Sequence, residues 1–291
     1  MSASQRHLVR AGTTGAGAVR VEITPTSAGW ERSGLRVVDL DPGTTYRFDT
    51  GEAEVIVVPL TGSAQVLIDE AGYTLHGRAD VFAGPTDVVY APRDAAVTLT
   101  AAEGGRFALC SALCDRRLAA SYLPAASVPV EFRGAGQASR EVHNFGVPGV
   151  LDADRIIACE VVTPGGNWSS WPPHKHDEER EGETQLEEIY YFEVADGPAG
   201  PGVGYQRVYG HRDAEIDITA EVATGDAVLI PHGWHGPSMA APGYDLYYLN
   251  VMAGSGDERA WLICDDPSHA WVRATWPDQP VDPRLPLGGA R

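Results

Sequence analysis

Basic side chains are scarce in this sequence: 22 lysines and arginines stand against 40 aspartates and glutamates, which gives a net charge of −18. A surface this acidic repels phosphate backbones and anionic membranes. We therefore expect neither nucleic acids nor membranes as partners. A small anionic substrate is not excluded, because one local arginine can outweigh the field of the whole molecule.

Long apolar runs are also lacking. No stretch approaches the roughly 20 apolar residues that a membrane-spanning helix needs. The N-terminal stretch MSASQRHLVRAGTTGAG has no apolar core of the length found in signal peptides. Together these features predict a cytoplasmic protein.

Cysteine is rare, and its spacing shows no CxxC pair, which leaves too few residues for a disulfide scaffold. We expect reduced cysteines that pack in the core. The four residues are Cys110, Cys114, Cys159 and Cys264.

Long segments with helical periodicity are scarce as well. Short runs rich in valine, isoleucine and tyrosine, such as EVIVVP, RIIACEVV, EIYYFEV and YDLYYLNV, recur between 33 glycines and 21 prolines. This texture is typical of a β-sandwich or barrel. We predict an all-β fold with few short helices, one of them over residues 115–122, and an irregular arm over residues 277–291.

Two stretches of the second half repeat patterns of the first half. GDAVLIPHG has the form of TDVVYAPRD, and EIYYFEVADG has the form of EVIVVPLTG. Two matched pairs in the same order predict two copies of one β-domain. We place the first domain at residues 1–130 and the second at residues 131–291, with a linker near residues 125–140.

Two histidines one residue apart, His174 and His176, mark a candidate metal site. Side chains at i and i+2 of a strand share a face, so both imidazoles can bind one ion as neutral nitrogen ligands. Glu188 is the best carboxylate ligand, because it opens an apolar strand where an unpaired charge is costly to bury. Parity places Glu187 on the opposite face, and Glu54 precedes its own strand in the matching first-half pattern.

A fourth ligand is expected in the turn IPHGWHGPS, where proline and glycine can present either His232 or His235 inward. An HxH pair alone is weak evidence, because a histidine on a strand is most often an ordinary hydrogen-bonded residue. The strand-initial glutamate and the turn together favour a metal site. Residues 177–183 have the composition of a solvated loop, and Lys175 faces away from both histidines by parity, which indicates a structural role.

These motifs resemble those of the cupin superfamily, whose first motif is HxH followed by a strand-opening glutamate and whose second is a Pro-x-Gly turn followed by histidine. They read here as His174-Lys-His176, Glu188 and Pro231-His-Gly233-Trp-His235. The resemblance implies two tandem cupin (double-stranded β-helix, jelly-roll) domains and selects His235 over His232 as the ligand. The first half has no HxH and no histidine after Pro92, so it resembles a cupin domain without its metal.

A closer resemblance covers nearly the whole chain. NWSSWPPHKHDE, LEEIYYFEV, GYQRVYG, IPHGWHGP and YYLNVMAG together resemble the 5-deoxy-glucuronate isomerase family of bacterial myo-inositol catabolism, and the uronate isomerase of pectin breakdown shares its two-cupin plan. The resemblance implies an aldose–ketose isomerase that converts 5-deoxy-D-glucuronate, a small sugar acid, to 5-dehydro-2-deoxy-D-gluconate.

The resemblance also implies one divalent metal ion that stabilises an enediolate. Zinc is our first choice, and manganese, iron, cobalt and nickel are also compatible with three histidines and one glutamate. The sequence does not decide the oligomeric state, and a homo-oligomer is compatible with it.

Proton transfer requires a base, and the candidates are Tyr190, which shares the face of Glu188, and His232. The substrate carboxylate requires an arginine, and the candidates are Arg140, Arg207 and Arg273, each of which could instead be structural.

Two other functions are compatible with these motifs. One is a cupin dioxygenase or oxidase that uses the same metal site. The other is a non-catalytic sugar-acid-binding cupin, which the complete ligand set of the second half disfavours.

Overall fold

The computed structural model describes residues 6–212, 214–256 and 258–288 and confirms the predicted all-β class. Its helices are short: α2 (Pro25–Ala28) and the 3₁₀ helices η1 (Ala125–Ser127), η2 (Gly136–Ala138) and η3 (Ala270–Asp278). Within the described residues, no helix combines the length and the hydrophobicity needed to cross a membrane. The predicted arm begins at the end of η3 and continues without regular structure to residue 288, and its last three residues lie outside the described part.

The helix predicted over residues 115–122 does not form in the described chain. The end of this segment belongs instead to β10 (Ser121–Leu123), which pairs with β7 (Val88–Ala91). A segment this short gains too little from its own hydrogen bonds to resist recruitment into a neighbouring sheet.

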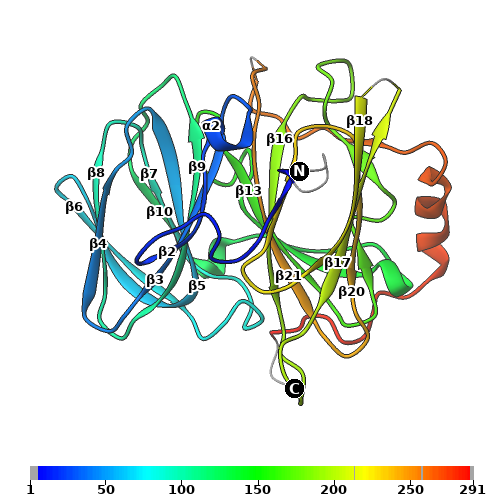
Figure 1. Cartoon of the computed structure of the whole chain (residues 1–291), viewed down its shortest axis with the longest axis horizontal. Coiled ribbons are helices and arrows are strands. Elements are labelled where there is room, and N and C mark those ends of the chain that lie inside the picture. The colour runs from blue at the N-terminus through cyan, green and yellow to red at the C-terminus, as the bar shows by residue number, and fades with distance from the viewer. Residues whose placement is uncertain (1–5, 213, 257, 289–291) are drawn as a thin grey trace.

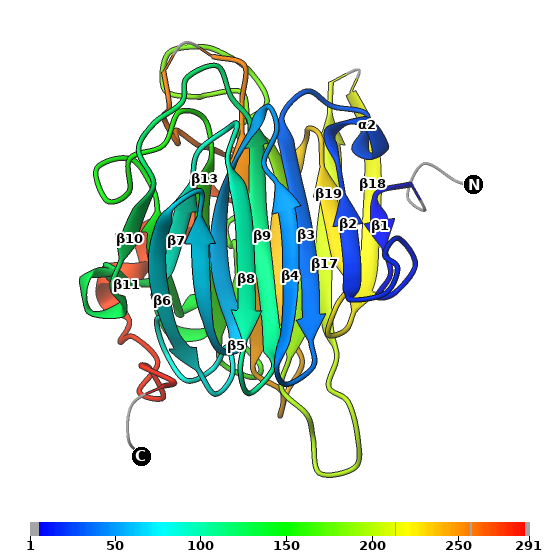
Figure 2. The ribbon, with the colours of Figure 1, turned by 90° about the vertical axis from the view of Figure 1, so that its left-hand side faces the viewer.

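The first half of the chain forms one sheet that folds over on itself (Figures 1 and 2). Its other strands are β2 (Val19–Ile23), β3 (Ser33–Leu40), β4 (Thr44–Asp49), β5 (Ala53–Ile68), β6 (Ala71–Arg78), β8 (Ala96–Ala101) and β9 (Gly105–Leu113). The long β5 makes the fold-over, because its first part pairs with β7 and β9 and its last part with β6 and β8. Val57, Val66 and Leu99 pack in the apolar interior that results.

The second half forms two sheets that enclose a second core (Figure 1). One sheet runs in the order β1 (Leu8–Val9), β19 (Ala227–Ile230), β16 (Glu187–Val194), β21 (Leu246–Ala253), β13 (Ile157–Thr163), β12 (Arg140–Gly146) and β11 (Val130–Arg133). The other runs β18 (Ala214–Val222), β17 (Gly204–His211), β20 (Trp234–Ala240), β15 (His174–Lys175) and β22 (Cys264–Asp265), with β14 (Trp168–Ser169) also paired to β20.

The N-terminal segment crosses from one half to the other. Although β1 lies within the first 130 residues, it pairs with β19 at the edge of a second-half sheet. The strand β11 and the helix η1 lie where the sequence pattern places the linker. The division into domains at residue 130 stays a prediction.

A third apolar layer joins the two halves. Leu35, Ile56 and Ala108, from β3, β5 and β9, belong to the same buried cluster as Tyr191 and Leu249, from β16 and β21. The strand alternation explains this layer, because each of these strands also turns its other face to the interior of its own half. The halves therefore share a continuous core, and this core fixes β16 and β21 behind the candidate site.

Candidate metal centre

The three predicted histidines converge inside the second half. His174 lies on β15 and His176 follows that strand, while His235 lies on β20 directly opposite His174. The ring of His235 lies 4.4 Å from that of His174 and 4.7 Å from that of His176, measured between centroids. One ligand nitrogen from each histidine lies within 4.8 Å of the other two, and all three side chains are buried.

Glu188 reaches the same point from β16. Its Oε2 lies 3.0 Å from Nε2 of His176 and 3.1 Å from Nε2 of His235, and the residue is 1% exposed. The neighbouring Glu187 points the opposite way and accepts backbone N–H groups of the first half, including that of Ser33 at 2.9 Å. Strand parity thus separates the two adjacent glutamates as expected from the sequence.

Backbone carbonyls orient two of the imidazoles. Nδ1 of His176 lies 3.2 Å from the carbonyl oxygen of Leu186, and Nδ1 of His235 lies 3.1 Å from that of Gly233. A ring that donates through Nδ1 keeps a lone pair on Nε2, which is the tautomer that binds a metal. Gly233 has a φ of +92°, and a Cβ there would meet the carbonyl oxygen of Tyr209 at 2.7 Å, so this turn requires glycine.

The electrostatics of the cluster suit a bound cation. The contact between Nε2 of His235 and Glu188 lacks hydrogen-bond geometry, so this buried nitrogen has no hydrogen-bond partner among the described residues. Burial, then repulsion from the other two histidines, lowers the pKa of His174 well below its usual value. Burial opposes ionisation of Glu188, yet its contacts with His176 and His235 lower its pKa to about 2. A buried carboxylate beside three imidazoles is a donor set that fits a divalent metal ion.

The acidic segment between the ligands is folded inward at two positions. Nζ of Lys175 lies 2.5 Å from Oδ1 of Asp177 and 2.6 Å from Oε1 of Glu183, and Glu183 is 1% exposed. The expectation of a solvated loop is therefore wrong for these two carboxylates. The cause is Lys175 itself, which points away from the histidines, is buried there, and needs compensating charges.

Tyr190, one of the two candidate bases, lies in the interior of the second half with its ring 6.1 Å from that of His235. Its Oη lies 3.1 Å from Oγ of Ser170, which lies 3.1 Å from Oη of Tyr248. Burial, reinforced by repulsion from Glu188, raises the pKa of Tyr190 well above its usual value. Near neutral pH this tyrosine is therefore protonated and can donate a proton.

His232, the other candidate base, lies near the N-terminal segment. Burial, then repulsion from His232, lowers the pKa of His7, so the two histidines are neighbours. Among the described residues, no hydrogen bond, ion pair or ring contact joins His232 to the four clustered side chains. Its Nε2 is buried without a hydrogen-bond partner in the described chain.

The three candidate arginines occupy different surroundings. Arg207 pairs with Asp217 and lies on the outer face of β17. The residues on either side of it in the strand, Gln206 and Val208, are buried. Arg273 is held by Asp265 through two hydrogen bonds. Arg140 is 5% exposed, and its charge, like that of Arg273, contributes to lowering the pKa of His174.

The sequence reasoning missed several polar residues of this interior. Ser170 joins the two tyrosines, and Asn250, which is paired with Tyr190 in the sheet, has a buried amide nitrogen without a partner among the described residues. Asn250 stands inside the apolar run YYLNVMA, and a buried polar residue in such a run is a usable signal. The backbones of Ser170 and Gly236 approach each other closely. A Cβ at Gly236 would lie 1.9 Å from the Ser170 carbonyl oxygen, so this approach requires glycine.

Residues 7–272 match the model of the KduI/IolB family. The chain belongs to this family. Similarity to the 5-deoxy-glucuronate isomerase of Geobacillus kaustophilus agrees: the two are 42% identical over 257 residues, which cover 87% of this chain and 90% of that protein. The predicted family and the predicted enzyme class, an isomerase, are thereby confirmed.

Solved structures similar to this chain confirm the predicted fold class of tandem cupin domains. An IolB-like protein of Salmonella typhimurium matches with a TM-score of 0.84 and 36% identity, over 92% of this chain and 99% of that one. The oxalate decarboxylase of Lactobacillus farciminis matches with a TM-score of 0.63 and 12% identity, over 89% and 88%. At that identity the second likeness concerns the fold alone.

Proposed function

We propose that this chain is a metal-dependent aldose–ketose isomerase that converts 5-deoxy-D-glucuronate to 5-dehydro-2-deoxy-D-gluconate in myo-inositol catabolism. The observation that carries the proposal is the buried cluster of three histidines and one glutamate in a member of the KduI/IolB family. The name of the similar Geobacillus protein supplies the substrate.

His174, His176, Glu188 and His235 would hold one divalent ion, with zinc as the first choice among several compatible metals. When bound, the ion supplies electrostatic stabilisation of the negative charge that develops on the substrate oxygens as the proton leaves. The two sheets of the second half enclose these four side chains and restrict the access of water, which strengthens charge interactions at the metal site.

Tyr190 and His232 are the proposed proton-transfer residues. The reaction removes a proton from the carbon beside the aldehyde and returns one to the aldehyde carbon, while carbonyl and hydroxyl exchange places. Tyr190, protonated and bonded to Ser170, is suited to donate a proton to a substrate oxygen or carbon. His232 would have to act from its place beside His7, and we rank it second.

Removal of the metal tests the proposal directly. Elemental analysis of the purified protein should find about one divalent ion per chain, and a chelator should abolish conversion of 5-deoxy-D-glucuronate followed by NMR. The metal-free protein should keep its β-sheet circular dichroism, because the surrounding cores are apolar and extensive. Full turnover by metal-free protein would rule the mechanism out.

His176→Ala should lose the metal, whereas the matched control His76→Ala, at an exposed histidine of β6, should keep both metal and activity. Full metal occupancy in His176→Ala would refute the ligand assignment. An oxygen electrode separates the oxidase alternative: steady oxygen consumption with the sugar acid, in place of isomerisation, would favour that function.

A further inference from the structure

A hollow of about 290 Å³ opens beside η3 and is walled by tryptophans. Trp168, Trp171 and Trp276 line it, together with the amide side chains of Gln137 and Gln279. Trp168 is 42% exposed, and its ring lies 5.5 Å from that of Trp171 in an edge-on arrangement. Such aromatic surface, left open to solvent, suits the apolar faces of a sugar.

Arg140 lies behind this wall. Its Nη1 donates to the carbonyl oxygens of Ala138 at 3.0 Å and Trp171 at 3.3 Å, and its guanidinium lies 5.7 Å from the ring centroid of Trp276. All three partners line the hollow. Trp171, whose carbonyl accepts from Arg140, lies three residues before the proposed metal ligand His174 in the chain. Arg140 thus lies beside the hollow and next to the segment that leads to the metal centre.

The charge of Arg140 is not compensated. Among the described residues no carboxylate forms an ion pair with it, and its hydrogen bonds go to backbone carbonyls. Burial lowers its pKa to about 10, so the guanidinium is still a cation near neutral pH. A buried cation without a counter-ion is costly, and an anionic ligand would remove that cost.

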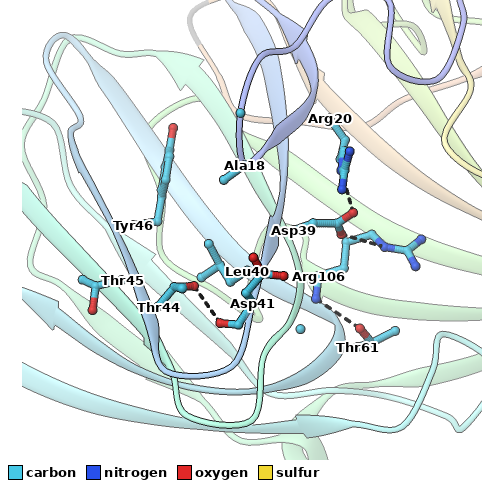
Figure 3. A pocket seen from close by; sticks show the side chains of 12 residues that line it. Ala18, Arg20, Asp39, Leu40, Asp41, Thr44, Thr45, Tyr46, Thr61 and Arg106 are labelled. Carbon is cyan, nitrogen blue, oxygen red and sulfur yellow. Dashed lines mark hydrogen bonds and ion pairs between the residues drawn. The ribbon is translucent and has the colours of Figure 1, made fainter.

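A hollow of the first half provides the contrast (Figure 3). Its volume is about 490 Å³, and Arg20 and Arg106 both point to Asp39, at 2.8 and 3.2 Å. Both arginines are thus paired with carboxylates of the chain, because Arg106 also pairs with Glu193 at 2.8 Å. Arg140 differs in that no carboxylate among the described residues forms an ion pair with it.

We propose that the tryptophan-lined hollow is the subsite that receives the sugar acid, and that Arg140 is the specificity residue that binds its carboxylate. The inference rests on the proposed function for the identity of the substrate. The aromatic walls would contact the C–H faces of the sugar, and the indole N–H of Trp276, which is buried without a partner among the described residues, would bond a hydroxyl. Loss of a charge-assisted pair of this kind weakens binding by about 10- to 100-fold.

Calorimetric titration of the metal-replete protein with D-glucuronate and D-glucose tests the subsite without turnover. Wild type and the matched control Arg20→Met should prefer the acid over the neutral sugar. Arg140→Met should lose that preference, by about 10- to 100-fold in the affinity for glucuronate, with little change for glucose. Arg140→Lys should recover part of it, because a point charge remains without the planar fork.

A purely structural role for Arg140 would lower the melting temperature of Arg140→Met but leave the preference for the acid intact, which would overturn the proposal. Equal binding of both sugars by wild type would overturn it as well. Trp168→Ala replaces an exposed residue, so the variant should fold. It should weaken the binding of both sugars alike, and unchanged affinities would show that the hollow is not part of the substrate site. Acid preference that depends on Arg140, without conversion of 5-deoxy-D-glucuronate, would reject the proposed function but keep the subsite.

Discussion

Glu54 and Glu188 hold matching positions in the two halves, each at the start of a long apolar strand and each almost fully buried. Glu54 is surrounded by donors of the chain: the backbone N–H groups of residues 154–156, at 2.6 to 2.8 Å, and the hydroxyl of Tyr90 at 2.7 Å. Glu188 meets imidazole nitrogens instead.

The partners therefore decide what a buried carboxylate does. Fixed N–H donors satisfy Glu54 and tie a loop of the second half to a strand of the first. The nitrogens around Glu188 belong to imidazoles, which can also bind a metal ion, so the surroundings of this carboxylate suit a cation. Both halves have the strand-initial glutamate, but only the second half has the HxH pair and the histidine after the Pro-x-Gly turn.

Glu188→Gln should have the largest effect on function. Loss of an outer partner of a metal ligand already costs about 10- to 100-fold, so loss of a ligand charge should lower metal affinity and kcat/KM by more than about 100-fold. The fold should survive, because glutamine is isosteric. Elemental analysis and the NMR assay give the two readouts, and a variant with normal metal content would contradict the assigned role.

Glu54→Gln should instead destabilise the protein while the metal stays bound. The amide keeps one acceptor oxygen for four donors and introduces N–H groups among them, at a cost of about 3 to 5 kcal/mol in unfolding free energy. Urea unfolding measures the loss, with metal content as the control. Unchanged stability would show that the carboxylate is not the tie between the halves.

Tyr190→Phe should lower kcat by about 100-fold if its hydroxyl transfers the proton. Tyr90→Phe is the matched control, because it also removes a buried tyrosine hydroxyl but lies in the first half. It should reduce stability by about 1 to 2 kcal/mol and leave kcat unchanged. Equal kcat values for both variants would assign Tyr190 a packing role only.

His143 is a buried histidine that is charged near neutral pH, whereas burial favours the neutral form of His174. Burial opposes its charge, yet bonds to Glu141 at 2.8 Å and Glu160 at 3.2 Å raise its pKa to about 9. Because the folded-state pKa lies above the unfolded value, this stabilisation is complete below about pH 6.5 and is lost as the pH rises through 9. We expect a decline of about 3 kcal/mol over that range in urea unfolding, which should flatten in His143→Gln.

Local pattern was sufficient for much of the site. Two-residue periodicity predicts that His174 and His176 share a face, and the structure brings their rings together with that of His235. Parity also separates Glu187 from Glu188, because backbone geometry alone sets the face on which a strand residue lies. The all-β class follows from the same short-range rules.

Sequence patterns gave wrong or incomplete predictions where distant parts of the chain form the environment of a residue. The run 177–183 is acidic like a solvated loop, yet two of its carboxylates are buried against Lys175, whose own burial no local rule reveals. The segment 115–122 lost its predicted helix to pairing with β7. Arg140, Arg207 and Arg273 are indistinguishable by type, and only the carboxylates around each tell them apart.

The sequence by itself determined which strands form, which of their faces are polar and which side chains can gather at one point, since these depend on neighbours in the chain. The tertiary structure alone decided that Glu54 meets N–H groups whereas Glu188 meets imidazoles. It also decided that Arg140 is buried beside the tryptophan-lined hollow with no carboxylate partner among the described residues. Charge compensation and burial depend on contacts between residues far apart in sequence, and those contacts exist only once the sheets have packed.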